Sequence, residues 1–128
     1  MKYLILGNGP AGVIAAETLR HNDPAGEIVM VGSEGLPPYS RMAIPYFLEG
    51  NIEEAGMYLR KTADHFASLR ITERNGRAVG LDTAARLVRY ADGTSENYDK
   101  LLIATGSRPR STRRYPDSTG RRSRIAGR

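Results

Sequence analysis

Three glycines near the N-terminus have a spacing that suits the binding of a phosphate chain. Residues 7–12 read GNGPAG and follow an apolar run over residues 2–6. In such a pattern Gly7 makes the tight turn after a strand, Gly9 lets the backbone approach a pyrophosphate, and Gly12 lets a helix pack closely on the strand. The free amides at the start of that helix carry a partial positive charge toward the phosphates. The pattern therefore predicts a dinucleotide site.

A carboxylate follows this turn at the distance where a ribose hydroxyl needs an acceptor. Glu34 lies 22 residues after Gly12, near the roughly 20 residues typical of dinucleotide-binding units. Two simpler interpretations stay open. The glycine-rich turn could bind no nucleotide, and Glu34 could be a solvated loop acid, because Gly32 and Ser33 occupy the strand end where the acid often lies.

A strand, a helix and a second strand are needed to position these residues. Residues 2–6 and the β-branched run over residues 27–31 have the composition of buried strands. Between them, apolar residues recur with helical spacing over residues 11–20, ahead of a turn cluster at residues 21–24. This order predicts a βαβ unit with two parallel strands.

The middle of the chain is expected to be less regular. Residues 33–52 are rich in glycine, proline and tyrosine, which indicates a long ordered loop with a short helix near residues 44–48. Thr62 is expected to cap a helix over residues 63–69.

The second half is dominated by short strands. Four β-rich runs, which we interpret as one antiparallel insertion, cover residues 71–74, 77–81, 86–90 and 95–98. Asp92-Gly93 predicts a hairpin turn, and an apolar run over residues 101–104 predicts a return to the parallel sheet. The predicted fold class is α/β: a Rossmann-like domain with a parallel sheet and a small antiparallel β insertion.

The net charge of +5 is confined to the end of the chain. Residues 1–110 hold 13 basic and 13 acidic side chains, whereas residues 111–128 hold six arginines and one aspartate. The basic charge therefore does not indicate a nucleic-acid-binding face on the body of the chain. Residues 111–128 have few apolar residues and are expected to form a disordered, arginine-rich tail.

Cysteine content and hydropathy restrict the class of protein further. The absence of cysteine excludes disulfides, thiolate zinc sites and dithiol redox relays. No uncharged stretch reaches the roughly 18 apolar residues of a spanning helix, and no secretory signal pattern precedes the first strand. We therefore expect a cytoplasmic protein without a membrane partner, in which any redox chemistry resides in a bound cofactor.

Residues 1–110 resemble the FAD-dependent pyridine nucleotide-disulfide oxidoreductases, in particular their ferredoxin-reductase-like and NADH oxidase-like branches. Four stretches carry the resemblance: residues 6–17 (LGNGPAGVIAAE), residues 32–41 (GSEGLPPYSR), the strand around Val79, and residues 98–110 (YDKLLIATGSRPR). The last is the most specific, because an ATG-type turn closes the first FAD-binding segment in that family. The resemblance implies an incomplete FAD-binding domain over residues 1–110.

The resemblance implies cofactor contacts position by position. It places the FAD pyrophosphate at the glycine turn, the adenosine ribose at Glu34 and the adenine edge at the backbone of Val79. Arg41 would lie beside the cofactor and Arg110 would reach the pyrophosphate, although a surface position is the simpler interpretation of each arginine. The complete implied set is Gly7, Gly9, Pro10, Ala11, Gly12, Glu34, Arg41, Val79, Thr105, Gly106 and Arg110. No catalytic residue and no metal ligand is assigned.

Met42 stands where the cysteine-dependent branches of the family carry a redox cysteine. A thioether forms neither a thiolate nor a disulfide, so peroxidase and disulfide reductase chemistry are not expected at this position. Tyr46 stands in the region where other branches place a lysine near the flavin. Plain packing is the simpler interpretation of Met42, Tyr46 and Phe47. His21 and His65 are not expected to act as catalytic bases.

The reaction implied by the resemblance is hydride transfer from NAD(P)H to FAD and onward to a redox protein, dioxygen or a small oxidant. A homodimer is among the assemblies that the resemblance allows. The alternative function is a non-catalytic dinucleotide-binding module, or an inactive fragment.

The tail has two interpretations of its own. The abrupt change of composition after Arg110 favours a shifted reading frame over residues 111–128, and a genuine basic arm is the competing account. Nucleic-acid binding by such an arm is not favoured, because Tyr115 is its only aromatic residue.

Overall fold

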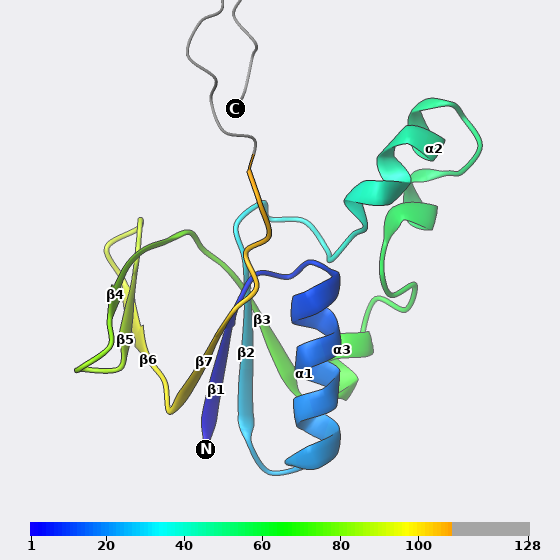
Figure 1. Cartoon of the computed structure of the whole chain (residues 1–128). Helices are drawn as coiled ribbons and strands as arrows, with labels where there is room; N and C mark the ends of the chain where they lie inside the picture. The colour runs from blue at the N-terminus through cyan, green and yellow to red at the C-terminus, as the bar shows by residue number, and fades with distance from the viewer. Residues whose placement is uncertain (109–128) are drawn as a thin grey trace, which may run out of the picture.

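A computed structural model describes residues 1–108 of the protein, so the tail and Arg110 lie outside the described part (Figure 1). The regular elements are β1 (Lys2–Leu6), α1 (Pro10–Asn22), β2 (Glu27–Gly32), α2 (Ile44–Leu48), α3 (His65–Ser68), β3 (Ile71–Asn75), β4 (Ala78–Asp82), β5 (Leu87–Tyr90), β6 (Ser95–Asn97) and β7 (Lys100–Ile103). Two short 3-10 helices, η1 (Arg41–Ala43) and η2 (Glu54–Met57), flank α2 in the chain.

A four-stranded parallel sheet forms the centre of the molecule, in the order β3-β2-β1-β7. β1 pairs with β2 on one side and with β7 on the other, so the first and last strands of the described chain are neighbours. The predicted βαβ unit and the return of the chain to the parallel sheet are both confirmed.

The sheet is covered on both faces, which makes a three-layer α/β fold (Figure 1). Alternate residues of β1 and β2 point to opposite faces, as strand geometry requires. The core between the sheet and the helices α1 and α3 is formed by the buried residues Ile5, Val13, Ala16, Ile28, Met30, Phe66 and Ile71. The opposite face packs on the antiparallel sheet β4-β5-β6 through Leu4, Leu6, Val29, Val31, Val88 and Tyr90.

Two details of the expected secondary structure are wrong. β3 belongs to the parallel sheet and not to the antiparallel insertion, because Ile71 is buried beside Ile28 in register with β2. Short β-branched runs have the same sequence pattern in a parallel and in an antiparallel sheet, so only the observed strand pairing shows to which sheet β3 belongs. Thr62 does not cap α3, which begins at His65 after Asp64.

Arg20 is a buried residue that the sequence did not single out. The residue is 9% exposed, and its guanidinium donates hydrogen bonds to backbone carbonyls in the segments that precede β2 and β3. The acceptors are the carbonyls of Asp23, Pro24, Gly26, Leu69 and Arg70, at 2.7–3.1 Å. One side chain thus joins the turn after α1 to the turn before β3.

Residues 41–56 form an arm that projects from the three layers (Figure 1). Its base is a short paired segment: the amide of Ser40 donates to the carbonyl of Met57 at 2.9 Å, and the amide of Leu59 donates to the carbonyl of Pro38 at 2.9 Å. Tyr39 and Tyr58 form the bridge between these two hydrogen bonds. The arm includes the predicted helix over residues 44–48.

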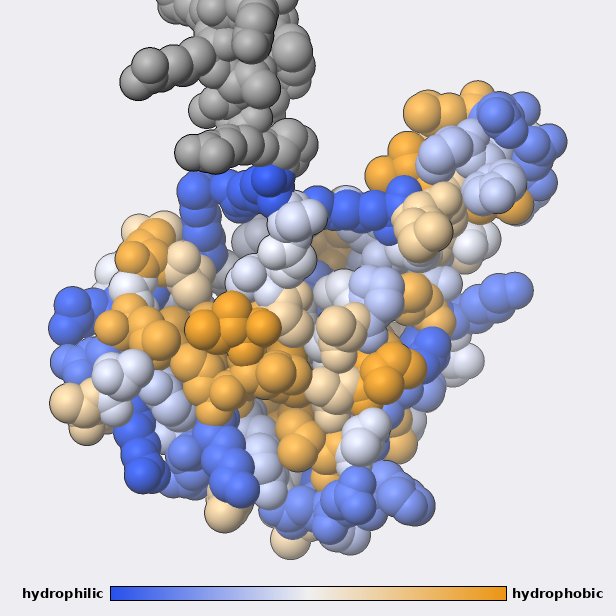
Figure 2. Space-filling view, in the orientation of Figure 1, coloured by the Kyte–Doolittle hydropathy of each residue, from blue (hydrophilic) through white to orange (hydrophobic). Residues whose placement is uncertain are grey.

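Apolar side chains of the arm are open to solvent, as the orange colour on the arm in Figure 2 shows. Met42 is 85% exposed, Leu48 76% and Tyr46 57%. Phe47 is 39% exposed. The expectation that Met42, Tyr46 and Phe47 serve as packing residues is wrong for the described chain. No helix within residues 1–108 is long and apolar enough to cross a membrane.

Candidate functional site

The glycine turn lies at the carboxyl end of β1, between α1 and the end of β7. Gly7 has a φ of +118°, and a Cβ there would lie 2.2 Å from the carbonyl oxygen of Ala104. A Cβ on Gly12 would lie 1.9 Å from the carbonyl oxygen of Gly7. Both positions therefore exclude a side chain for reasons of folding, and they bring α1 and β7 against the turn.

Gly9 differs from these two glycines because the space around it is open. A Cβ at Gly9 would meet no atom within 4 Å, and its φ of −75° is one that any residue can adopt. Folding therefore does not require glycine at this position. An open surface at a helix start is what a closely approaching phosphate chain needs, so the open space fits the expected ligand.

The start of α1 leaves backbone amides available to such a ligand. Gly9 is the N-cap and makes no side-chain cap hydrogen bond, and Pro10 has no amide hydrogen. The amides of Ala11 and Gly12 belong to the first turn, which has no intrahelical acceptor. A diphosphate at this point would supply that acceptor and favourable charge.

The turn after β7 lies directly beside the glycine turn. The amide of Ala104 donates to the carbonyl of Leu6 at 2.8 Å, which extends the pairing of β7 with β1 to the end of the strand. The amide nitrogen of Thr105 lies 3.1 Å from the Cβ position of Gly7. Gly106 has a φ of +71°, a conformation that favours glycine. We call residues 7–12 and 104–106 together the glycine corner.

Glu34 lies in the loop after β2 and is already engaged by two donors. The hydroxyl of Tyr39 donates to Oε2 of Glu34 at 2.6 Å, and the guanidinium of Arg41 donates to Oε1. The hydrogen bond from Tyr39, followed by that from Arg41, holds the pKa of the Glu34 carboxyl below its usual value. Glu34 is therefore ionised at neutral pH, as an acceptor of ribose hydroxyls must be.

Val79 occupies an irregular point of the antiparallel sheet. The register between β4 and β5 shifts between Ala78 and Gly80, so Val79 has no partner in β5. Its side chain is 62% exposed. A bulge of this kind leaves backbone groups unpaired, which suits the expected contact through the Val79 backbone.

The structure thus brings together the residues predicted to contact the pyrophosphate at the glycine turn. It does not show such an arrangement for the two predicted arginines. Gly7, Gly9, Gly12 and Thr105 meet at the glycine corner. Arg41 contacts Glu34. Arg110 lies outside the described residues.

Asn8 is a residue of the site region that the sequence did not single out. Its side-chain amide donates to the carbonyl of Leu36 at 3.3 Å, and a Cβ on Gly32 would lie 2.4 Å from the Asn8 side chain. Asn8 therefore links the glycine turn to the loop that carries Glu34. Gly32 was the one sequence signal for this contact, because a residue without a side chain at the end of β2 leaves the space that Asn8 occupies.

Two further polar clusters stabilise the fold. Glu17 of α1 accepts from Arg60 at 2.6 and 2.7 Å and contacts His65 at 2.8 Å, which ties the chain beyond the arm to α1. The arginine hydrogen bond is the main cause that lowers the pKa of Glu17. Across the other layer, Glu96 contacts Lys2, Arg74 and Tyr90. Within residues 1–108, no cluster of histidine and carboxylate side chains suits a metal ion.

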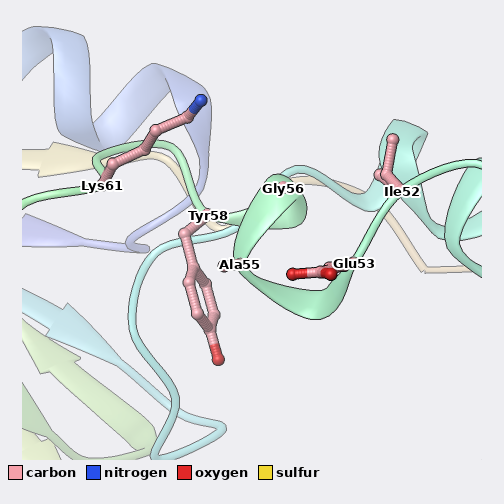
Figure 3. A pocket seen from close by; sticks show the side chains of 6 residues that line it. All are labelled: Ile52, Glu53, Ala55, Gly56, Tyr58 and Lys61. Atoms are coloured by element: carbon pink, nitrogen blue, oxygen red, sulfur yellow. The ribbon is translucent and has the colours of Figure 1, made fainter.

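Two cavities in the described part of the chain do not coincide with the glycine corner, although Ala11 of the corner lines one of them. One of about 370 Å³ is formed at the arm and the segment that follows it (Figure 3). Its lining residues are Ile52, Glu53, Ala55, Gly56, Tyr58 and Lys61. A second, of about 520 Å³, lies between α1 and the exposed edge strand β7. Neither contains Glu34 or the glycines of the corner.

Comparison with known proteins agrees with this geometry. The family model described as pyridine nucleotide-disulphide oxidoreductase matches residues 1–125. The chain belongs to this family. The match extends beyond Arg110, the point at which the resemblance was expected to end.

Several relatives that this chain resembles are named as reductases. The chain is 37% identical over 112 residues to rhodocoxin reductase of Rhodococcus erythropolis. The aligned region covers 86% of this chain and 26% of that protein. It is 34% identical over 109 residues to the ferredoxin–NAD(+) reductase component of the p-cumate 2,3-dioxygenase system of Pseudomonas putida. That aligned region covers 85% of this chain and 27% of the relative. The chain thus spans about a quarter of the length of these relatives.

The fold is shared with solved reductase structures. The putidaredoxin reductase–putidaredoxin complex matches with a TM-score of 0.80 and 31% identity, over 87% of this chain and 27% of the matched chain. These likenesses confirm the predicted α/β fold class and the family resemblance.

Proposed function

We propose that this chain supplies the FAD-binding part of an NAD(P)H-dependent flavoprotein reductase. The observation that carries the proposal is the open surface at Gly9, between two glycines that are fixed by packing and at the start of a helix. A diphosphate placed there would accept hydrogen bonds from the free amides of α1. Glu34, ionised and at the neighbouring strand end, would accept the hydroxyls of the adenosine ribose.

The remaining predicted contacts are proposals of the same kind. Thr105 and Gly106 would approach the cofactor from the turn beside Gly7, and the unpaired backbone of Val79 would meet the adenine edge. Arg41 would contact a phosphate oxygen only after it leaves Glu34 or by bridging the two anions. Arg110 would add a cation near the pyrophosphate.

The flavin would supply the redox chemistry, and the chain would bind and orient its adenosine diphosphate half. Relatives are named as ferredoxin reductases, so we propose a small redox protein as electron acceptor and NAD(P)H as electron donor. The absence of cysteine and the exposed Met42 are in keeping with transfer through flavin alone. A cytoplasmic location, expected from the sequence, stays a proposal.

A non-catalytic nucleotide-binding module remains the alternative, and ligand preference separates the two. The proposed function predicts that purified chain titrated with FAD binds it with a measurable dissociation constant. Gly9→Val places a branched side chain where the diphosphate would lie and should weaken FAD binding at least ~100-fold.

The same variant should stay folded with a melting temperature only slightly below that of the wild type, because a Cβ at Gly9 meets no protein atom although valine is a poorer N-cap than glycine. This retained stability is the control. Unchanged FAD affinity in a folded Gly9→Val protein would show that the site is misplaced.

A further inference from the structure

We propose that Tyr39 is a positioning residue that holds the Glu34 carboxylate in place for the adenosine ribose. This inference rests on the proposed function, because it concerns how the same site is prepared for its ligand. Tyr39 has no role in the residue set derived from the sequence. The geometry that points to it is the 2.6 Å hydrogen bond from its hydroxyl to Oε2 of Glu34.

The donor is fixed by the backbone and not by the carboxylate alone. Tyr39 lies in the paired segment at the base of the arm, opposite Tyr58 and between two backbone hydrogen bonds of 2.9 Å. The loop that carries Glu34 has no such pairing, and the Glu34 side chain is 39% exposed. A carboxylate that is free to rotate loses conformational entropy on binding a ligand, and an existing hydrogen bond removes part of that cost.

The two protein donors leave room for the ribose. An ionised carboxylate offers about four lone-pair sites on its two oxygens. Tyr39 uses one site on Oε2 and Arg41 uses one on Oε1. One site on each oxygen is left, and the two hydroxyls of a ribose are spaced for such a pair. Tyr39 and Arg41 are therefore compatible with ribose binding and orient the acceptor for it.

The hydroxyl of Tyr39 also affects the charge of the acceptor. Within residues 1–108, Tyr39 and Arg41 are the titratable groups that lower the pKa of Glu34, and partial burial acts against them. Removal of the Tyr39 hydroxyl moves this pKa back toward its usual value. Ribose binding needs the ionised form, so affinity in such a variant is lost at a higher pH on acidification than in the wild type.

The test compares two tyrosines from the same bridge. Tyr39→Phe removes only the hydroxyl that donates to Glu34, and Tyr58→Phe removes the hydroxyl that donates to Glu54 at 2.8 Å. FAD affinity is measured by titration from about pH 7.5 down to about pH 4, across the usual range of carboxyl pKa values. The melting temperature of each variant is measured in parallel.

Tyr39→Phe should weaken FAD binding about 5- to 10-fold at neutral pH, less than the full effect of a hydrogen bond to a charged group because Tyr39 acts through Glu34, and the deficit should widen as the pH falls. Tyr58→Phe should match the wild type within about twofold. In a Glu34→Gln background, Tyr39→Phe should have no further effect, because Tyr39 acts through the Glu34 carboxylate.

Two results would overturn the inference. Unchanged or tighter FAD binding by Tyr39→Phe would mean that its hydroxyl is irrelevant or competes with the ribose. An equal loss in the Glu34→Gln background would place its action elsewhere. Either result leaves the proposed function intact if the wild type binds FAD and Gly9→Val does not, whereas a wild type that binds no FAD removes the proposed function itself.

Discussion

The glycine corner and the arm each combine loop and helical residues, yet they differ in how tightly the described chain packs around them. At the corner, backbone atoms of three segments approach so closely that Gly7 and Gly12 admit no side chain. In the arm, Gly50 has open space around it, and Met42 and Leu48 are exposed. The difference indicates that the shape of the proposed diphosphate site is determined by packing within residues 1–108, whereas the shape of the arm depends on few internal contacts.

The largest loss of stability is expected from substitution of a glycine in the glycine corner. Gly12→Val forces a side chain into the Gly7 carbonyl, 1.9 Å from the new Cβ, and should lower the free energy of unfolding by about 3 kcal/mol or more. Gly50→Ala, in the arm, should cost only about 1 kcal/mol, because its φ of +77° is strained for alanine but its surroundings are open. Urea denaturation measures both. Similar losses in the two variants would contradict the contrast between the corner and the arm.

The next largest effect on stability is expected at Arg20, which lies away from the glycine corner and the arm. Arg20→Met should lower the free energy of unfolding by about 2–4 kcal/mol, because five carbonyl acceptors lose their donor in a buried place. Arg89→Met is the matched control, since the Arg89 side chain is 63% exposed. A loss of stability no larger than that of the control would mean that the Arg20 hydrogen bonds are not maintained in solution.

The smallest effect is expected in the arm. Leu48→Ser replaces a side chain that is 76% exposed and should change the free energy of unfolding by no more than about 0.5 kcal/mol. Leu4→Ser, in the fully buried centre of β1, provides the contrast and should prevent stable folding. A large loss of stability in Leu48→Ser would show that the arm packs on the body of the protein and that its apolar side chains are not free in solution.

Much of the parallel sheet could be predicted from the sequence, because continuous apolar runs and the glycine turn have local causes. The glycine corner was predictable for the same reason: Gly7 and Gly12 each follow from a close backbone approach. The assignment of β3 was wrong because its pairing with β2 depends on contacts about 40 residues apart, such as Ile28 with Ile71.

The interactions that were missed depend on side-chain directions between distant segments. Arg20 meets carbonyls 49 and 50 residues away, and nothing in its helix marks it as buried. Asn8 reaches a carbonyl 28 residues later. The hydrogen bonds from Tyr39 and Arg41 to Glu34 could not be predicted either, because the sequence motif contains these residues but does not indicate that they contact one another. The assignment of cofactor contacts stays a prediction for every residue of the proposed site.

Binding of the adenosine diphosphate half of FAD by residues 1–108 can be tested by competition. FAD is bound to the purified chain, and ADP, FMN and nicotinamide mononucleotide are added as competitors. We predict that ADP displaces FAD, whereas FMN and nicotinamide mononucleotide, which lack the adenosine diphosphate group, do not. Displacement of FAD by FMN at concentrations where ADP has no effect would contradict this assignment of the site.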